Sequence, residues 1–155
     1  MGLVKVKSKV MIGKVKIKQI NTAAQNALRN TAETLHTAIV QAGVIPRDTG
    51  AMQDEGTFVD LSKLRQGKVS IVTATPYARR WYFNPEGVRF HRANWQSTVK
   101  RRKGPNKGKT VTIEHDGNPN AKDHWYEDWE PGGANGSFIY DSFKENLKRE
   151  MKRSI

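Results

Sequence analysis

The groups of this chain best suited to metal binding or acid–base catalysis are its histidines and the carboxylates near them. His115 is followed by Asp116, and Asp123 precedes His124, with Glu127 three residues further along. Imidazole and carboxylate groups serve as metal ligands and as general bases, so they raise the hypothesis of a metal-dependent nuclease. Their spacing matches no zinc motif, and no two histidines have the spacing of one helix face. We therefore expect no metal, no cofactor and no catalytic residue.

Other kinds of catalysis have still less support in the sequence. The chain contains no cysteine, which excludes disulfides, thiolate chemistry and cysteine-based zinc sites. Gly104 and Gly108 lie within a lysine-rich run and not between a strand and a helix, so they do not form a phosphate-binding loop. No serine occurs in a nucleophile elbow. The sequence favours a protein that is not an enzyme.

Residues 100–109 form the densest positive segment of a basic chain. The chain has 27 Lys and Arg against 15 Asp and Glu, and its net charge is +12. Such a cluster is typical of phosphate contacts, which depend on salt and not on base sequence. No recognition helix or aromatic platform accompanies it. A solvated loop, a DNA contact and docking to an acidic protein surface are all open for its six basic residues, which are Lys100, Arg101, Arg102, Lys103, Lys107 and Lys109.

The first 18 residues are predicted to form a lysine-rich, strand-like arm. Apolar residues occupy even positions up to Ile12 and odd positions after Gly13, as at Val15 and Ile17. Alternation with a period of two indicates a half-buried strand, and the change of phase indicates a bulge or a turn. The segment lacks the apolar core of a signal peptide, and no stretch is long enough to cross a membrane.

Two long amphipathic helices are predicted, one in each half of the chain. The first spans residues 21–42, with Asn21 or Thr22 as its cap and Gly43 as its stop. The second spans residues 137–154. Each places an apolar stripe on one face. The stripes comprise Ala24, Leu28, Leu35, Ile39 and Ala42 in the first helix, and Ile139, Phe143, Leu147 and Met151 in the second.

Two antiparallel hairpins are predicted between these helices. The first pairs residues 57–61 with 68–74, and a short helix from Pro76 to Phe83 follows it. The second pairs residues 95–99 with 110–115 and carries the basic segment at its tip. We expect this long hairpin to project from the body of the protein.

The expected fold class is α+β, with one antiparallel sheet of about four strands packed by the long first helix and the C-terminal helix. The length of 155 residues corresponds to one domain. Within it, we expect four successive parts. They are the arm at 1–18, a helix and hairpin core at 19–83, the basic hairpin insertion at 88–117, and a bend with the C-terminal helix at 118–155.

The order of three short motifs resembles that of a known group of proteins. The first helix leads into Pro46-x-Asp48-Thr49-Gly50, with Met52 two residues later, and the first hairpin leads into Thr75-Pro76-Tyr77-Ala78. Asn118-Pro119-x-Ala121 then leads to Trp125-Tyr126-Glu127 and the terminal helix. This order resembles the minor capsid and neck proteins of tailed bacteriophages, which join head to tail or complete the tail. The resemblance covers residues 20–83 and 118–152, but neither the arm nor the basic insertion.

The resemblance implies a structural virion protein that assembles in the host cytoplasm into a sixfold or twelvefold ring. Its partners would be copies of itself, adjacent head-closure, connector or tail proteins, and DNA in the lumen, with no role for a membrane. Asp-Thr-Gly also marks retroviral-type aspartic proteases, but there the motif lies on a strand and here it follows a helix. The alternatives are a small basic DNA-binding protein and, more remotely, the nuclease using His115 and His124.

Overall fold

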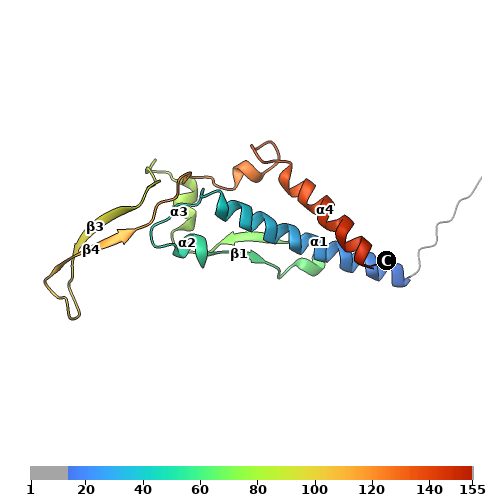
Figure 1. Cartoon of the computed structure of the whole chain (residues 1–155), viewed down its shortest axis with the longest axis horizontal. Coiled ribbons are helices and arrows are strands. Elements are labelled where there is room, and N and C mark those ends of the chain that lie inside the picture. The colour runs from blue at the N-terminus through green and yellow to red at the C-terminus, as the bar shows by residue number, and fades with distance from the viewer. Residues whose placement is uncertain (1–13, 155) are drawn as a thin grey trace, which may run out of the picture.

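The computed structural model describes residues 14–154, and these form an elongated molecule (Figure 1). The predicted α+β class, with a long first helix and a C-terminal helix, is confirmed. No helix within these residues is long and apolar enough to span a membrane. In chain order the elements are α1 (Lys14–Gln41), α2 (Ala51–Asp54), β1 (Thr57–Asp60), η1 (Leu64–Gln66), β2 (Ser70–Thr73), α3 (Ala78–Phe83), β3 (Trp95–Lys100), β4 (Thr110–His115), η2 (Glu127–Trp129) and α4 (Phe138–Ser154).

Helix α1 begins earlier than the sequence pattern predicted. It starts at Lys14, so the predicted strand is wrong over residues 14–18, while residues 1–13 of the arm lie outside the described part. Extending an existing helix adds one hydrogen bond per residue, whereas a strand here has no neighbouring strand in residues 14–154 to pair with. The predicted cap is also wrong, because Thr22 lies inside the helix and donates to the Lys18 carbonyl at 3.0 Å. The predicted stop is confirmed by Gly43, which has a left-handed φ of +63°.

Helix α4 lies along α1, and polar groups as well as apolar ones join the two helices (Figure 1). Ala23 and Ala27 of α1 are fully buried. The buried amide of Asn146 donates to Thr31 Oγ1 at 3.1 Å. The Glu150 carboxylate, also buried, accepts hydrogen bonds from two asparagines of α1. Buried polar groups that find partners add specificity to an interface otherwise built from small side chains.

The predicted sheet of about four strands is wrong. β1 pairs only with β2, with Thr57 opposite Thr73, and β3 pairs only with β4, with Trp95 opposite His115. The first hairpin lies against α1, whereas the second extends away from the body (Figure 1). Alternation in a sequence identifies strands and their faces, but it does not say which hairpins share a sheet. The extension of the basic hairpin from the body agrees with expectation.

The apolar core lies around the C-terminal end of α1 and is rich in aromatic groups. Its buried members are Ile39, Val44, Ile45, Trp125 and Trp129, with Tyr82 packed against them. The Tyr82 ring meets the Trp125 ring edge-on, with 4.9 Å between centroids. Helix α3, which supplies Tyr82, begins at Ala78 and not at the predicted Pro76, because Pro76 and Tyr77 form the turn before it.

Candidate functional site

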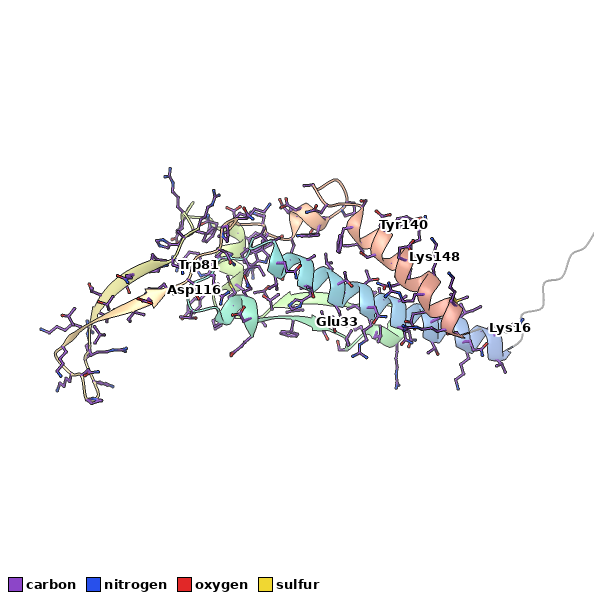
Figure 2. All side chains as sticks on the ribbon, viewed as in Figure 1. Lys16, Glu33, Trp81, Asp116, Tyr140 and Lys148 are labelled. Atoms are coloured by element: carbon purple, nitrogen blue, oxygen red, sulfur yellow. The ribbon has the colours of Figure 1, made fainter. Side chains whose placement is uncertain are left out.

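The motifs that carry the resemblance meet where the second hairpin leaves the body. Figure 2 shows Trp81 and Asp116 on two of the segments that converge at this junction. A groove of about 610 Å³ lies here. Its walls include Trp81, Phe90 and Trp95, and they also include most residues of the two turn motifs, namely Pro46, Asp48, Thr49, Gly50, Pro76 and Tyr77.

Gly50 allows the first turn motif to fold back on itself. Its φ of +87° lies in the left-handed region, and it precedes the first residue of α2. A Cβ atom at this position would lie 2.6 Å from Asp54 Oδ2, so the Asp54 side chain already occupies the space that a larger residue would need. The Arg47 guanidinium binds Asp54 at 3.1 Å and reaches Asp116 at 3.6 Å. The motif is therefore a compact turn that lies between the groove and the second hairpin.

Asp48 connects this turn to the end of strand β4. Its carboxylate contacts Nδ1 of His115, and its carbonyl accepts the backbone N–H of Asp116 at 2.9 Å. The other ring nitrogen of His115 is 2.7 Å from Ser97 Oγ on strand β3. One imidazole thus joins the first motif to both strands of the hairpin. The Asp48 carboxylate lies on a loop and faces a histidine, which is not the strand-borne carboxylate pair of an aspartic protease.

Three aromatic rings stack at the base of the hairpin. Trp95 lies between His91 and His115, with centroid separations of 4.2 Å and 4.1 Å. The interplanar angles are 14° and 12°, so the rings are nearly parallel. Trp81 of α3 meets Phe90 edge-on at 5.8 Å beside this stack. The segment before β3 and the end of β4 are held together by ring faces in addition to the strand ladder.

The third motif fastens the far side of the junction. Asn118 is buried, and its amide donates to the Ile45 carbonyl at 2.6 Å and to the Gln53 side chain. Its backbone N–H donates to the His91 carbonyl at 3.2 Å. Asn118 therefore links three segments, and the sequence offered it only as part of a resemblance. In the second motif Ala78 is buried, while Tyr77 is 65% exposed over the groove.

The basic segment forms the turn of the second hairpin and its flanking residues. Arg101 N–H donates to the Lys109 carbonyl at 3.0 Å, and Gly108 N–H donates to the Arg101 carbonyl at 2.8 Å, which closes the turn. All six predicted contact residues are exposed. None of them forms an ion pair with a carboxylate of residues 14–154. We call these six residues the cationic tip.

The two faces of the second hairpin differ in polarity. The register places Ser97 opposite Ile113 and Val99 opposite Val111, which puts these four side chains on the face of the Trp95–His115 pair. The opposite face carries only polar and charged residues, all of them exposed. On the first face Val99 is 42% exposed, because the hairpin projects from the body. Its apolar face therefore continues outward from the groove, with Val99 exposed and Val111 and Ile113 only partly buried by residues 14–154.

The histidines of the nuclease hypothesis have separate surroundings. His124 lies beside the rings of Tyr82 and Phe83, at 5.1 Å and 5.8 Å, and its Nδ1 is 3.3 Å from Asp123. That contact, with a hydrogen bond from Asn84, lowers the pKa of Asp123. His115 instead contacts Asp48. In the described part of the chain no three His, Asp or Glu side chains gather as a metal site, so this hypothesis gains no geometric support.

Sequence reasoning missed a second groove of about 330 Å³, whose wall includes Ile71, Trp129, Glu130 and Ile139. Its residues come from four separate segments, and no local pattern brings them together. The sequence indicated Glu127 as a possible metal ligand beside His124 and as part of the third motif, but it gave no indication of Glu130 in the groove wall. Comparison of the chain with family models, with curated proteins and with solved structures finds no significant match.

Proposed function

We propose that this chain is a structural protein of a tailed bacteriophage virion, forming a ring in the neck, the head–tail connector or the tail-completion region. The supporting observation is the junction, where two turn motifs distant in the sequence line one groove, and where Asp48 contacts His115 of the basic hairpin and Asn118 contacts Ile45. The motifs connect secondary-structure elements and fix their orientation, which is expected of a subunit with a structural function. The Asp48–His115 and Asn118–Ile45 contacts hold the geometry of the junction in place, while Arg47 Nε, Thr75 Oγ1 and Trp95 Nε1 are buried there without a hydrogen-bond partner among the described residues.

The projecting hairpin supports assembly into a larger structure. A two-stranded hairpin is marginally stable by itself in water, and it gains stability when its apolar face packs on another element. Here that face extends beyond the body. A subunit in a ring receives such a partner from its neighbour, because ring contacts join different surfaces of successive copies. We propose a sixfold or twelvefold ring, stacked on head-closure, connector or tail proteins, with DNA passing through its lumen.

A small basic DNA-binding protein is the alternative, and the cationic tip is the observation that favours it. That function predicts tight duplex binding by the isolated monomer, with an affinity that falls steeply as salt increases. A ring subunit instead predicts self-assembly, with DNA affinity that is weak until several copies surround the duplex. The two functions therefore differ in what the protein does in the absence of DNA.

Native mass spectrometry and negative-stain imaging of the purified full chain distinguish these functions. We expect closed rings with one subunit number, either from the chain alone or after coexpression with the neighbouring head and tail proteins. Monomers under both conditions, with tight and salt-sensitive duplex binding, would establish the DNA-binding alternative instead. The imaging is done without nucleic acid, after nuclease treatment, so that DNA cannot bridge the copies.

A further inference from the structure

We propose that the hairpin β3–β4 of one copy docks on a second copy of this chain, in the groove beside α1, β2 and η2. The cationic tip then lies against the acidic turn of that second copy, which we define as Glu127, Asp128 and Glu130. This inference rests on the proposed function, because it names the contact between successive subunits of the ring.

The docking element combines an apolar face with a charged end. Val99, Val111 and Ile113 share one face of the hairpin, and the cationic tip lies directly beyond them. Burying that apolar face removes from water the surface that the body of the same chain leaves open. The six cations find no carboxylate among residues 14–154 of their own chain, so their charge is free for a partner.

The second groove provides a matching apolar surface. It has a volume of about 330 Å³ and is lined by Leu28 and Leu35 of α1, Val69 and Ile71 at β2, and Trp129 and Ile139. Tyr140, at the start of α4, is 68% exposed next to it in the chain, and Ile139 is 40% exposed. Figure 2 shows Tyr140 pointing outward from the first turn of α4. Uncovered apolar area at this position marks an interaction surface.

Negative charge lies on the same side as this apolar groove. Glu130 is part of its wall, and Glu127 is one helical turn earlier. Both are exposed and form no ion pair within the described residues, whereas Asp128 is held by Lys122 at 2.6 Å. Burial, together with the charges of Glu130 and Glu127, raises the pKa of Tyr82. The groove therefore combines an apolar floor with an anionic rim, as the hairpin combines an apolar face with a cationic end.

These two surfaces cannot meet within one molecule. The hairpin extends away from the body, and the acidic turn lies on the body near the start of α4 (Figure 1). When the hairpin of one copy docks in the groove of a second, the groove of the first and the hairpin of the second are still unoccupied. Each can bind a further copy, and the series closes into a ring when the rotation between successive copies permits. Charge complementarity of this kind also orients the encounter between copies.

The apolar component favours a protein partner over DNA. Phosphate contacts use cations and hydrogen-bond donors, and the cationic tip alone would satisfy them. They leave Val99 exposed and Val111 and Ile113 only half-buried, whereas a second copy covers the apolar face and the cations together. Duplex DNA is therefore an outcome of the test and not the expected partner.

Charge reversal tests the contact directly in the full chain. The tip variant carries Arg101→Glu and Arg102→Glu, and the groove variant carries Glu127→Lys and Glu130→Lys. We expect each variant alone to weaken self-assembly about tenfold or more, because like charges then face each other. A chain with all four substitutions should form rings again, and an equimolar mixture of the two variants should assemble with alternating subunits. The control, Lys144→Glu with Arg149→Glu, lowers the net charge by the same amount as the tip variant but at α4, and it should assemble normally.

A disulfide provides a second measurement that does not depend on electrostatics. The chain contains no cysteine, so Lys103→Cys with Glu130→Cys introduces the only thiols. Mild oxidation should yield covalent oligomers that extend to the full ring, and each single-cysteine variant should stop at a disulfide-linked dimer at most. A doubly substituted chain that shows no more cross-linking than the single variants would overturn the proposal.

The other outcomes separate this inference from the proposed function. Rings that persist in both reversal variants overturn the docking contact but leave a ring-forming virion protein in place. Tip reversal that abolishes duplex binding and leaves rings intact assigns the tip to DNA and also overturns the contact. A chain that stays monomeric in every condition overturns the contact, while the presence of the chain in purified virions decides the function separately.

Discussion

The carboxylate of Asp48 contacts the imidazole of His115, although 67 residues separate them in the sequence. The His115 side chain is 11% exposed and that of Asp48 is 62% exposed, so the pair lies at the edge of the junction. This contact attaches the first turn motif to the end of strand β4. It makes the orientation of the basic hairpin depend on a turn that follows helix α1.

Replacing Asp48 by Ala should loosen the hairpin without unfolding the body. The contact is partly open to solvent, so we expect a loss of about 1 kcal/mol in the free energy that holds the hairpin in place. Hydrogen exchange of the β3 and β4 amides should become faster, and exchange in α1 and α4 should not change. Glu55→Ala is the matched control, because Glu55 is exposed and forms no ion pair within residues 14–154. Equal protection of β3 in both variants would contradict this role.

Gly50→Ala should destabilise the protein more than Gly67→Ala does. Both glycines have left-handed φ values, +87° and +73°, which cost a residue with a side chain about 1–2 kcal/mol. A Cβ atom at Gly50 would also collide with Asp54, while nothing lies within 4 Å of one at Gly67. Urea unfolding monitored by circular dichroism gives the difference. Equal midpoints for the two variants would show that the turn tolerates the extra atom.

Glu150→Ala should weaken the packing of α4 on α1. Its carboxylate accepts from Asn26 at 3.3 Å and Asn30 at 3.5 Å, and removing it leaves those amides without this acceptor. We expect a loss of about 2 kcal/mol in the free energy of unfolding. Glu145→Ala is the control on the same helix, because Glu145 is exposed and pairs only with Lys148. An unfolding midpoint for Glu150→Ala that equals that of the control would refute the buried contact.

Under the proposed virion function, neutralising part of the cationic tip should impair particle assembly. The variant replaces Lys100, Arg101, Arg102 and Lys103 by Gln, which keeps a polar side chain and removes the charge. We expect fewer infectious particles or poorer DNA retention, because the tip loses its electrostatic attraction to a neighbouring surface. Titre and packaged DNA are measured after the variant gene is returned to the phage. Unchanged yield and infectivity would remove the tip from the account.

Local patterns predicted individual elements well. The α4 boundaries, both hairpins and the stop at Gly43 were confirmed because periodicity and a left-handed glycine are local properties. The same patterns failed where tertiary context decides. Residues 14–18 belong to a helix despite their strand-like alternation, and the two hairpins form separate sheets because the chain after α3 carries the second away from the body.

The candidate site could be foreseen only in pieces. The turn motifs and the basic segment were identified from residue types, but their meeting depends on contacts between distant segments, such as Asn118 with Ile45 and Asp48 with His115. The stack of His91 and His115 on Trp95 had no sequence signal, because aromatic residues alone do not indicate their neighbours. Of the acidic turn, only Glu127 was singled out from the sequence, as a possible metal ligand, and its relation to Glu130 and an apolar groove required the fold.

The location of this chain in virus particles tests the central claim most directly. Antibodies raised against the purified chain, coupled to gold, are applied to purified virions of the phage proposed to encode it, and the particles are imaged by electron microscopy. The account predicts label at the head–tail junction or at the adjoining end of the tail. A chain that is abundant in infected cells but absent from purified particles, by labelling and by mass spectrometry, would contradict a structural role in the virion.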